Sequence, residues 1–188
     1  MNNTKKNIFE SAIKVFSNSG YDGAIMDDIA VNAGVAKGTL YYNFKSKEEI
    51  FKYTITEGMN VVLKQIESAT EKEEDSLIKL KILCRVQLSL VYENKDFFKV
   101  IMSQLWGREI RNLQIREVIQ LYINIIEKYL KDAMEQGVIK KSDTSFMAYI
   151  FLGTICSTAV YELENKDNID IENVIDNLMQ YILTGIQR

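Results

Sequence analysis

Residues 26–44 read MDDIAVNAGVAKGTLYYNF, and this stretch decides the fold of the N-terminal part of the chain. Ala30 is small enough for two helices to touch closely, and Gly34, four residues later, can end the first helix in a left-handed conformation. Leu40 and Phe44 are four residues apart, so they give a second short helix one apolar side. This spacing of a small residue, a glycine and a buried aliphatic residue predicts a helix-turn-helix.

The second of these helices leaves polar and aromatic side chains on its outer side. A helix that enters the major groove of DNA contacts base edges with such side chains, while flanking donors hold phosphates. The alternative for each residue is a solvated surface side chain with no partner. The residues that we expect to contact DNA are Lys37, Gly38, Thr39, Tyr41, Tyr42, Asn43 and Lys47.

The segment from Asn7 to Phe51 resembles the N-terminal DNA-binding domain of the TetR family of bacterial transcriptional regulators. The resemblance rests on AxxxF in the first helix, on GY, and on DIAxxAGVxKGTLYYxFKSKEEIF. It implies a three-helix DNA-binding domain at residues 1–47 and an effector-binding and dimerisation domain at 48–188. It also implies that Lys47 anchors a phosphate. The family usually has Ser or Thr before the second helix, and this chain has Ala24 and Ile25 there instead, which removes a helix cap.

The whole chain is predicted to be all-α, with about nine helices. It contains no proline, which suits long uninterrupted helices, and no strand-like alternation bounded by turns. Ser46 followed by Glu49 is a capping-box pattern that starts a long helix. Outside the helix-turn-helix, apolar spacing predicts helices at 4–19, 46–69, 77–93, 96–105, 110–136, 143–163 and 171–186.

Composition excludes several classes of protein. The chain of 188 residues has no histidine, which rules out histidine catalysis and histidine-bound zinc. Cys84 and Cys156 are isolated, and we expect buried thiols in a reducing cytoplasm rather than a disulfide or a metal site. No signal peptide or membrane span is expected. The net charge is −3, divided as +1 over residues 1–52 and −4 over the rest. We expect neither an enzyme nor a cofactor.

The C-terminal part is expected to bind a second copy and a small molecule. A single helix-turn-helix makes too few contacts for tight binding, so a homodimer should read an inverted-repeat DNA site. The last two helices supply interface candidates, although core packing is the alternative for each: Phe151, Ile155, Ala159, Glu162, Leu178, Met179 and Ile182. The middle helices supply pocket candidates, with the same alternative: Tyr92, Met102, Trp106, Tyr122 and Tyr149.

Three functions remain open from the sequence. The first is a homodimeric repressor that a small-molecule effector releases from its operator. The second is a DNA-binding regulator without such a switch: a constitutive factor, one controlled by a protein partner, or an activator. The third, an enzyme, lacks a histidine, a phosphate-binding glycine loop and a nucleophile with a base. A roomy apolar cavity in the middle helices would favour the first function over the second.

Overall fold

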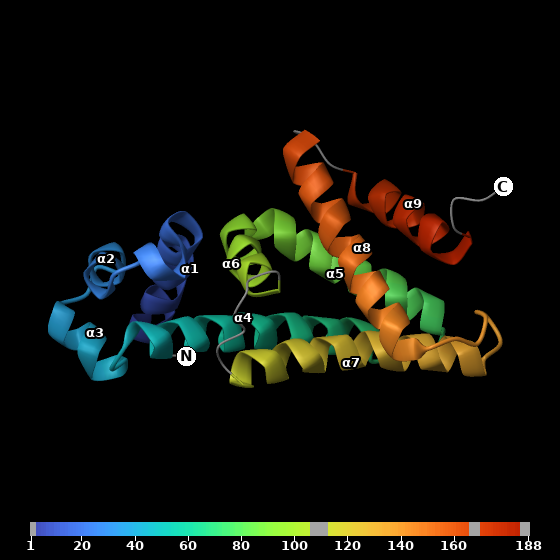
Figure 1. Ribbon diagram of the computed structural model, residues 1–188, viewed down its shortest axis with the longest axis horizontal. Helices are drawn as coiled ribbons and strands as arrows, with labels where there is room; N and C mark the ends of the chain where they lie inside the picture. Colours follow the sequence, from blue (N-terminus) through green and yellow to red (C-terminus); the bar gives the residue numbers. More distant parts are fainter. Residues whose placement is uncertain (1–2, 106–112, 166–169, 185–188) are drawn as a thin grey trace. The chain divides into compact units, whose positions relative to one another are not determined.

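The computed structural model describes residues 3–105, 113–165 and 170–184, and within these ranges the chain forms nine helices and no strand (Figure 1). The all-α prediction is therefore confirmed. The helices are α1 (Asn3–Gly23), α2 (Met26–Asn32), α3 (Lys37–Asn43), α4 (Lys47–Thr70), α5 (Ser76–Glu93), α6 (Lys95–Leu105), α7 (Leu113–Glu135), α8 (Thr144–Asn165) and α9 (Ile171–Thr184).

The chain divides into two compact units. The first comprises residues 1–60 and 94–118, and the second comprises 61–93 and 119–188. Helix α4 starts in the first unit and ends in the second, and so does α7. The sequence predicts that the DNA-binding domain ends at residue 47 and that the effector-binding and dimerisation domain begins at residue 48. The two compact units do not test this division by function, which stays a prediction.

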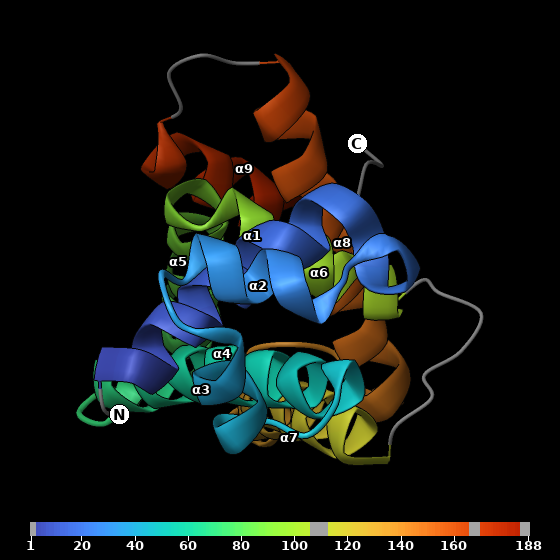
Figure 2. The ribbon, with the colours of Figure 1, turned by 90° about the vertical axis from the view of Figure 1, so that its left-hand side faces the viewer.

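The first unit is built around an aromatic cluster between α1 and α4. The rings of Phe16 and Phe51 pack edge to face with their centroids 4.8 Å apart. The ring centroid of Tyr21 is also 4.8 Å from that of Phe51. Gly20 allows this arrangement because its φ of 66° breaks the helical path just before Tyr21. Figure 2 gives a second view of α1, α2 and α3, turned by 90° from that of Figure 1. The cluster fixes the start of α4 against α1.

Helix α6 also belongs to the first unit, and it packs closely on α1 and α4. The Ser17 hydroxyl donates to Asp96 Oδ1 at 2.6 Å. The ring of Phe97 lies over Gly58, where a Cβ would stand only 2.1 Å from Phe97 Cζ. A side chain at position 58 therefore requires the ring to move. Gly58 is the residue that permits α4 and α6 to pack together.

In the second unit, α8 crosses α5 and α9 runs beside both (Figure 1). The Arg85 guanidinium on α5 donates two hydrogen bonds of 2.6 Å to the Glu172 carboxylate on α9. Lys81 Nζ lies 2.9 Å from Asp176 Oδ1. Beneath these ion pairs the helices bury aliphatic side chains such as Leu83 and Leu88. The ion pairs are exposed, so burial of the apolar core contributes more stability than they do.

Helix α8 is long and apolar enough to cross a membrane by length and composition. Thr144–Glu164 has a mean hydropathy of 1.4, and 39% of that window is buried within the chain. The sequence led us to expect no such segment. Core helices of water-soluble proteins meet the same criterion, so the finding alone does not indicate a membrane.

Candidate nucleic-acid interface

The turn of the helix-turn-helix forms as the sequence predicts. Gly34 has a φ of 64°, and its N–H donates to the carbonyl of Val31 at 3.1 Å. The N–H of Val35 reaches back to the carbonyl of Ala30, also at 3.1 Å. This pair of bonds is a Schellman motif, which satisfies the last carbonyls of α2. Ile29 and Ala30 are buried, so α2 presents its apolar side to the core.

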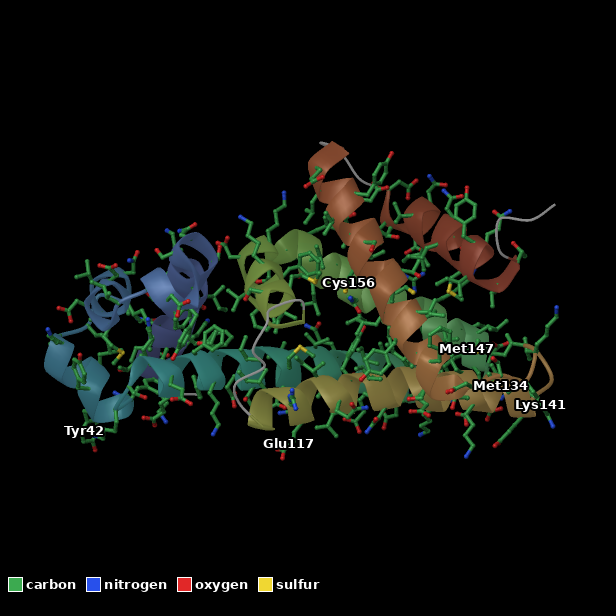
Figure 3. All side chains as sticks on the ribbon, in the orientation of Figure 1. Tyr42, Glu117, Met134, Lys141, Met147 and Cys156 are labelled. Atoms are coloured by element: carbon green, nitrogen blue, oxygen red, sulfur yellow. The ribbon has the colours of Figure 1, made fainter. Side chains whose placement is uncertain are left out.

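Helix α3 separates its buried and exposed sides sharply. Leu40 is fully buried and Phe44 nearly so. Tyr42 is 82% exposed and points outward in Figure 3. The remaining predicted DNA-contacting residues of α3 are exposed or, for Asn43, half-buried: Lys37, Gly38, Thr39, Tyr41 and Asn43. The structure thus gathers six of the seven predicted residues on one short helix.

Two of these residues are held by local hydrogen bonds. The Lys37 ammonium lies 2.8 Å from Asp27 Oδ2 on α2, and this hydrogen bond raises the pKa of Lys37. The Asn43 amide donates to the Thr39 carbonyl at 2.8 Å within α3. The contact between Lys37 and Asp27 was not anticipated from the sequence. Its only signal was an acidic residue in the first turn of α2.

Lys47 lies at the start of α4 and reaches back to the turn between α1 and α2. Its ammonium donates to the carbonyls of Asp22 and Ala24 at 3.1 and 2.9 Å, and it lies 4.7 Å from the centre of the Tyr21 ring. Ile25 stands at the N-cap of α2 without a side-chain cap, as the departure from the family pattern implied. Lys47 therefore has an internal structural role beside any contact with DNA.

The capping box at the start of α4 forms with one change. The Glu49 N–H donates to Ser46 Oγ at 3.1 Å, as expected. The Glu49 carboxylate accepts from the N–H of Lys45, at 2.6 Å, rather than from that of Ser46. Both bonds satisfy donors ahead of the helix, and the acidic side chain suits the positive end of α4.

The predicted pocket residues are not all in one place. Met102 is half-buried on α6 in the first unit, and Trp106 lies outside the described residues. Tyr149 is 53% exposed on α8. Tyr92 on α5 is half-buried, its hydroxyl has no hydrogen-bond partner among the described residues, and burial beside Glu162 raises its pKa to about 12.

Tyr122 belongs to a polar cluster inside the second unit. It is buried, and its hydroxyl donates to Gln87 Oε1, while Gln87 Nε2 donates to Cys156 Sγ at 3.7 Å. Figure 3 places Cys156 on α8. Burial raises the pKa of Cys156 to about 11 and that of Cys84 to about 12, so both stay as thiols. Gln87 was missed because a lone glutamine carries no spacing signal.

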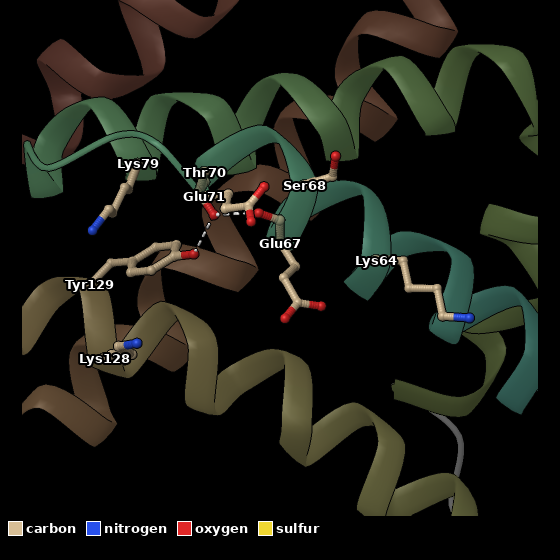
Figure 4. Close-up of a pocket in the computed structure, with 8 residues that line it drawn as sticks. All are labelled: Lys64, Glu67, Ser68, Thr70, Glu71, Lys79, Lys128 and Tyr129. Carbon is tan, nitrogen blue, oxygen red and sulfur yellow. Dashed lines mark hydrogen bonds between the residues drawn. The ribbon is translucent and has the colours of Figure 1, made fainter.

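A polar groove of about 510 Å³ lies between α4, α5 and α7 in the second unit (Figure 4). At its base the hydroxyls of Thr70 and Tyr129 are 2.9 Å apart. None of the predicted pocket residues lines it. Its lining residues are Lys64, Glu67, Ser68, Thr70, Glu71, Lys79, Lys128 and Tyr129.

The predicted interface residues are placed mostly inside the chain's own core. Ile182 is half-buried, whereas the other six are at most 4% exposed: Phe151, Ile155, Ala159, Glu162, Leu178 and Met179. The opposite side of α8 is apolar and exposed. We call this surface the α8 stripe, and it consists of Phe146, Tyr149, Ile150, Val160 and Tyr161. Its members lie three, four, fourteen and fifteen residues after Phe146, a helical spacing that was readable in the sequence, but α8 is apolar on every side.

Comparison with known proteins covers nearly the whole chain. Residues 8–54 match the family described as bacterial regulatory proteins, tetR family, and residues 55–185 match the YsiA-like protein, C-terminal region. The fatty acid metabolism regulator protein of Bacillus subtilis is 27% identical over 184 residues, covering 95% of this chain and 93% of that protein.

Two solved structures extend the similarity to the fold. One is a candidate fatty acid metabolism regulator of Clostridium perfringens, with 44% identity, a TM-score of 0.88 and coverage of 97% of this chain and 99% of that one. The other is the transcriptional regulator FadR from Bacillus subtilis in complex with stearoyl-CoA, with 27% identity, a TM-score of 0.83 and the same coverage. The chain belongs to the TetR family of bacterial regulatory proteins and is a DNA-binding transcriptional regulator.

Proposed function

We propose that the protein is a homodimeric repressor that binds an inverted-repeat operator and leaves it when a long-chain acyl-CoA binds. The DNA-reading part is α3, which exposes Lys37, Thr39 and Tyr42. One such helix of seven residues contacts few base pairs, so two copies are needed for a tight and specific site. The residues assigned to DNA are those that the sequence predicts, including Lys47.

We place the dimer interface on exposed rather than buried side chains. A side chain that its own chain already buries adds little contact area to a partner, which applies to Phe151 and Ile155. The α8 stripe offers Ile150, 49% exposed, and Tyr149, 53% exposed. Tyr181 on α9 is 61% exposed. Burial of this surface against a second copy would also account for the apolar character of α8.

The effector class rests on one observation: FadR from Bacillus subtilis, described in complex with stearoyl-CoA, aligns with 97% of this chain at 27% identity. The match over residues 55–185 supports a shared ligand-binding part. A coenzyme A thioester joins an apolar chain to an anionic nucleotide, so it needs an apolar tunnel and cationic groups at its mouth. The proposal gives the protein no catalytic role and places it in the cytoplasm.

The test is release of the protein from its own operator. Fragments bound by the purified protein are first selected from genomic DNA, and an enriched inverted repeat supplies a fluorescent duplex. Stearoyl-CoA is then titrated at fixed protein and DNA, with coenzyme A alone and stearate alone as matched controls. We expect release by stearoyl-CoA at concentrations at least about tenfold below those at which either control acts.

Three results would contradict this proposal in different ways. Equal release by coenzyme A alone would exclude the acyl chain as the recognised part. An operator that stays bound in the presence of every compound would favour the regulator without a small-molecule switch. Failure to enrich any repeat would contradict the dimeric operator itself.

A further inference from the structure

The ion pair between Asp27 and Lys37 joins the two helices of the DNA-binding motif. Four ion pairs occur among the described residues, and only this one involves a residue that we assign to DNA contact. Lys37 is the first residue of α3, and Asp27 lies in the first turn of α2. The ammonium and the carboxylate oxygen are 2.8 Å apart. The contact therefore links α2 to the N-terminus of the DNA-reading helix.

Both side chains are accessible to solvent, so the pair adds little to stability. The side chain of Lys37 is 62% exposed and that of Asp27 is 51% exposed. Exposed pairs are screened by water and salt, and many contribute almost nothing to the free energy of unfolding. Thr39 and Tyr42, further along α3, are exposed as well. Its consequence is expected in DNA binding rather than in folding.

Pairing changes what Lys37 offers to DNA. Non-specific binding depends on the number of cations that neutralise phosphates and release counterions. A lysine that must first leave a carboxylate gains less from a phosphate than an unpaired lysine does. The same carboxylate fixes the direction of the lysine side chain. At a matched base edge the ammonium would be held by the base, whereas at a random sequence it would stay with Asp27.

We propose that Asp27 is a positioning and specificity-determining residue, which holds Lys37 against α2 and withholds its charge from non-specific phosphate contacts. The proposal rests on the assignment of α3 as the DNA-reading helix. Asp27 itself need not touch DNA. It lowers affinity for random sequence more than affinity for the operator, so it widens the ratio between the two.

The neighbouring residue provides a matched control. Asp28 carries the same charge, is exposed in the same turn of α2, and makes no ion pair among the described residues. Asp27→Asn and Asp28→Asn remove equal charge at adjacent positions. Any general attraction of a less acidic surface to DNA is common to both variants. Only Asp27→Asn frees Lys37.

The experiment measures binding of the full-length protein to an operator duplex and to a scrambled duplex of equal length and composition, at several salt concentrations. For Asp27→Asn we expect the slope of log affinity against log salt on scrambled DNA to steepen by about 0.9 per protomer. The ratio of operator to scrambled affinity should fall by about tenfold. Asp28→Asn should leave both the slope and the ratio at the wild-type values. Asp27→Glu should restore them.

A second set of variants, made in a Lys37→Met protein, separates the effect of breaking the ion pair from the effect of removing the carboxylate charge. In a Lys37→Met protein, Asp27→Asn should no longer steepen the slope, because no lysine is released. Equal slopes for Asp27→Asn and Asp28→Asn would overturn the proposal, and so would a change that persists in Lys37→Met. A wild-type protein that fails to distinguish the two duplexes would instead contradict the operator-binding function on which the proposal rests.

Discussion

The outer side of α3 and the α8 stripe are both exposed, yet they differ in chemistry. The first carries an ammonium, hydroxyls and one protruding ring, exemplified by Lys37, Thr39 and Tyr42. The second carries apolar rings and aliphatic groups without a charge, such as Phe146, 65% exposed, and Ile150. Each surface lies on a helix whose other side is buried. The two helices therefore present opposite chemistry for opposite kinds of partner.

The difference shows why exposure alone does not identify a functional surface. Hydroxyls and ammonium groups keep their water until a charged partner replaces it, so they suit the phosphates and base edges of DNA. Exposed rings in a row lose unfavourable contact with water when a protein surface covers them. Salt and a buried charge should therefore affect the two surfaces differently.

Salt should give the largest effect. If a dimer neutralises about six to ten phosphates, operator affinity should fall by about 10³–10⁵ between roughly 50 and 200 mM salt. Association through the α8 stripe is apolar, so the dimer dissociation constant should change by less than about tenfold. Anisotropy with a labelled operator measures the first quantity, and sedimentation velocity measures the second. Parallel weakening of both would mean that the dimer interface is ionic and does not rest on the apolar α8 stripe.

A charge placed in the α8 stripe should give the next largest effect. Ile150→Asp would bury a carboxylate and its symmetry mate in the proposed interface, which costs several kcal/mol. The protein should become monomeric at micromolar concentration, and operator affinity should fall at least about a hundredfold, equivalent to roughly 3 kcal/mol. Sedimentation and anisotropy are again the measurements, with circular dichroism to verify the helices.

The control for this variant is Leu121→Asp on α7. Leu121 is 53% exposed and Ile150 is 49% exposed, so the two substitutions place a charge on similar apolar positions in the second unit. Leu121→Asp should leave the dimer and its DNA binding unchanged. If the dimer persists in Ile150→Asp but dissociates in Leu121→Asp, the interface lies on α7 and not on α8.

The sequence predicted the DNA-binding motif well because its geometry depends on neighbours along the chain. Gly34 ends α2 through bonds that span three to five residues, and Ser46 caps α4 through a bond to the residue three positions later. Leu40 and Phe44 face inward because helical spacing puts them on one side. Local rules of this kind require no knowledge of the rest of the fold.

The remaining features depend on pairs that are distant in sequence. Gly58 contacts Phe97 only because α6 packs on α4, and no sequence pattern in either segment predicts this contact. The cluster around Gln87 and Tyr122 similarly joins positions 35 residues apart. The interface candidates such as Ile155 were chosen from α8, whose apolar residues surround the helix. Periodicity cannot distinguish the buried side of such a helix from its exposed side.

Lys47 should give the smallest effect, because its ammonium already binds the carbonyls of Asp22 and Ala24. Lys47→Met keeps most of the apolar stem and removes the two hydrogen bonds. We expect the free energy of unfolding to fall by about 1 kcal/mol and Tm to fall by about 2–4 °C. Operator affinity should fall less than about tenfold and by a similar factor on scrambled DNA, since a phosphate contact carries no sequence information.

Thermal melting and anisotropy together separate the two roles of Lys47, with Lys14→Met as an exposed control on α1. If affinity falls while Tm stays at the wild-type value, phosphate anchoring dominates and the internal bonds contribute little. If Tm falls while affinity and its salt slope are unchanged, the assignment of Lys47 to DNA is wrong. If both Tm and operator affinity fall, the Lys47 ammonium stabilises the turn after α1 and also binds phosphate beside α3. The same cation would then contribute to folding and to DNA binding.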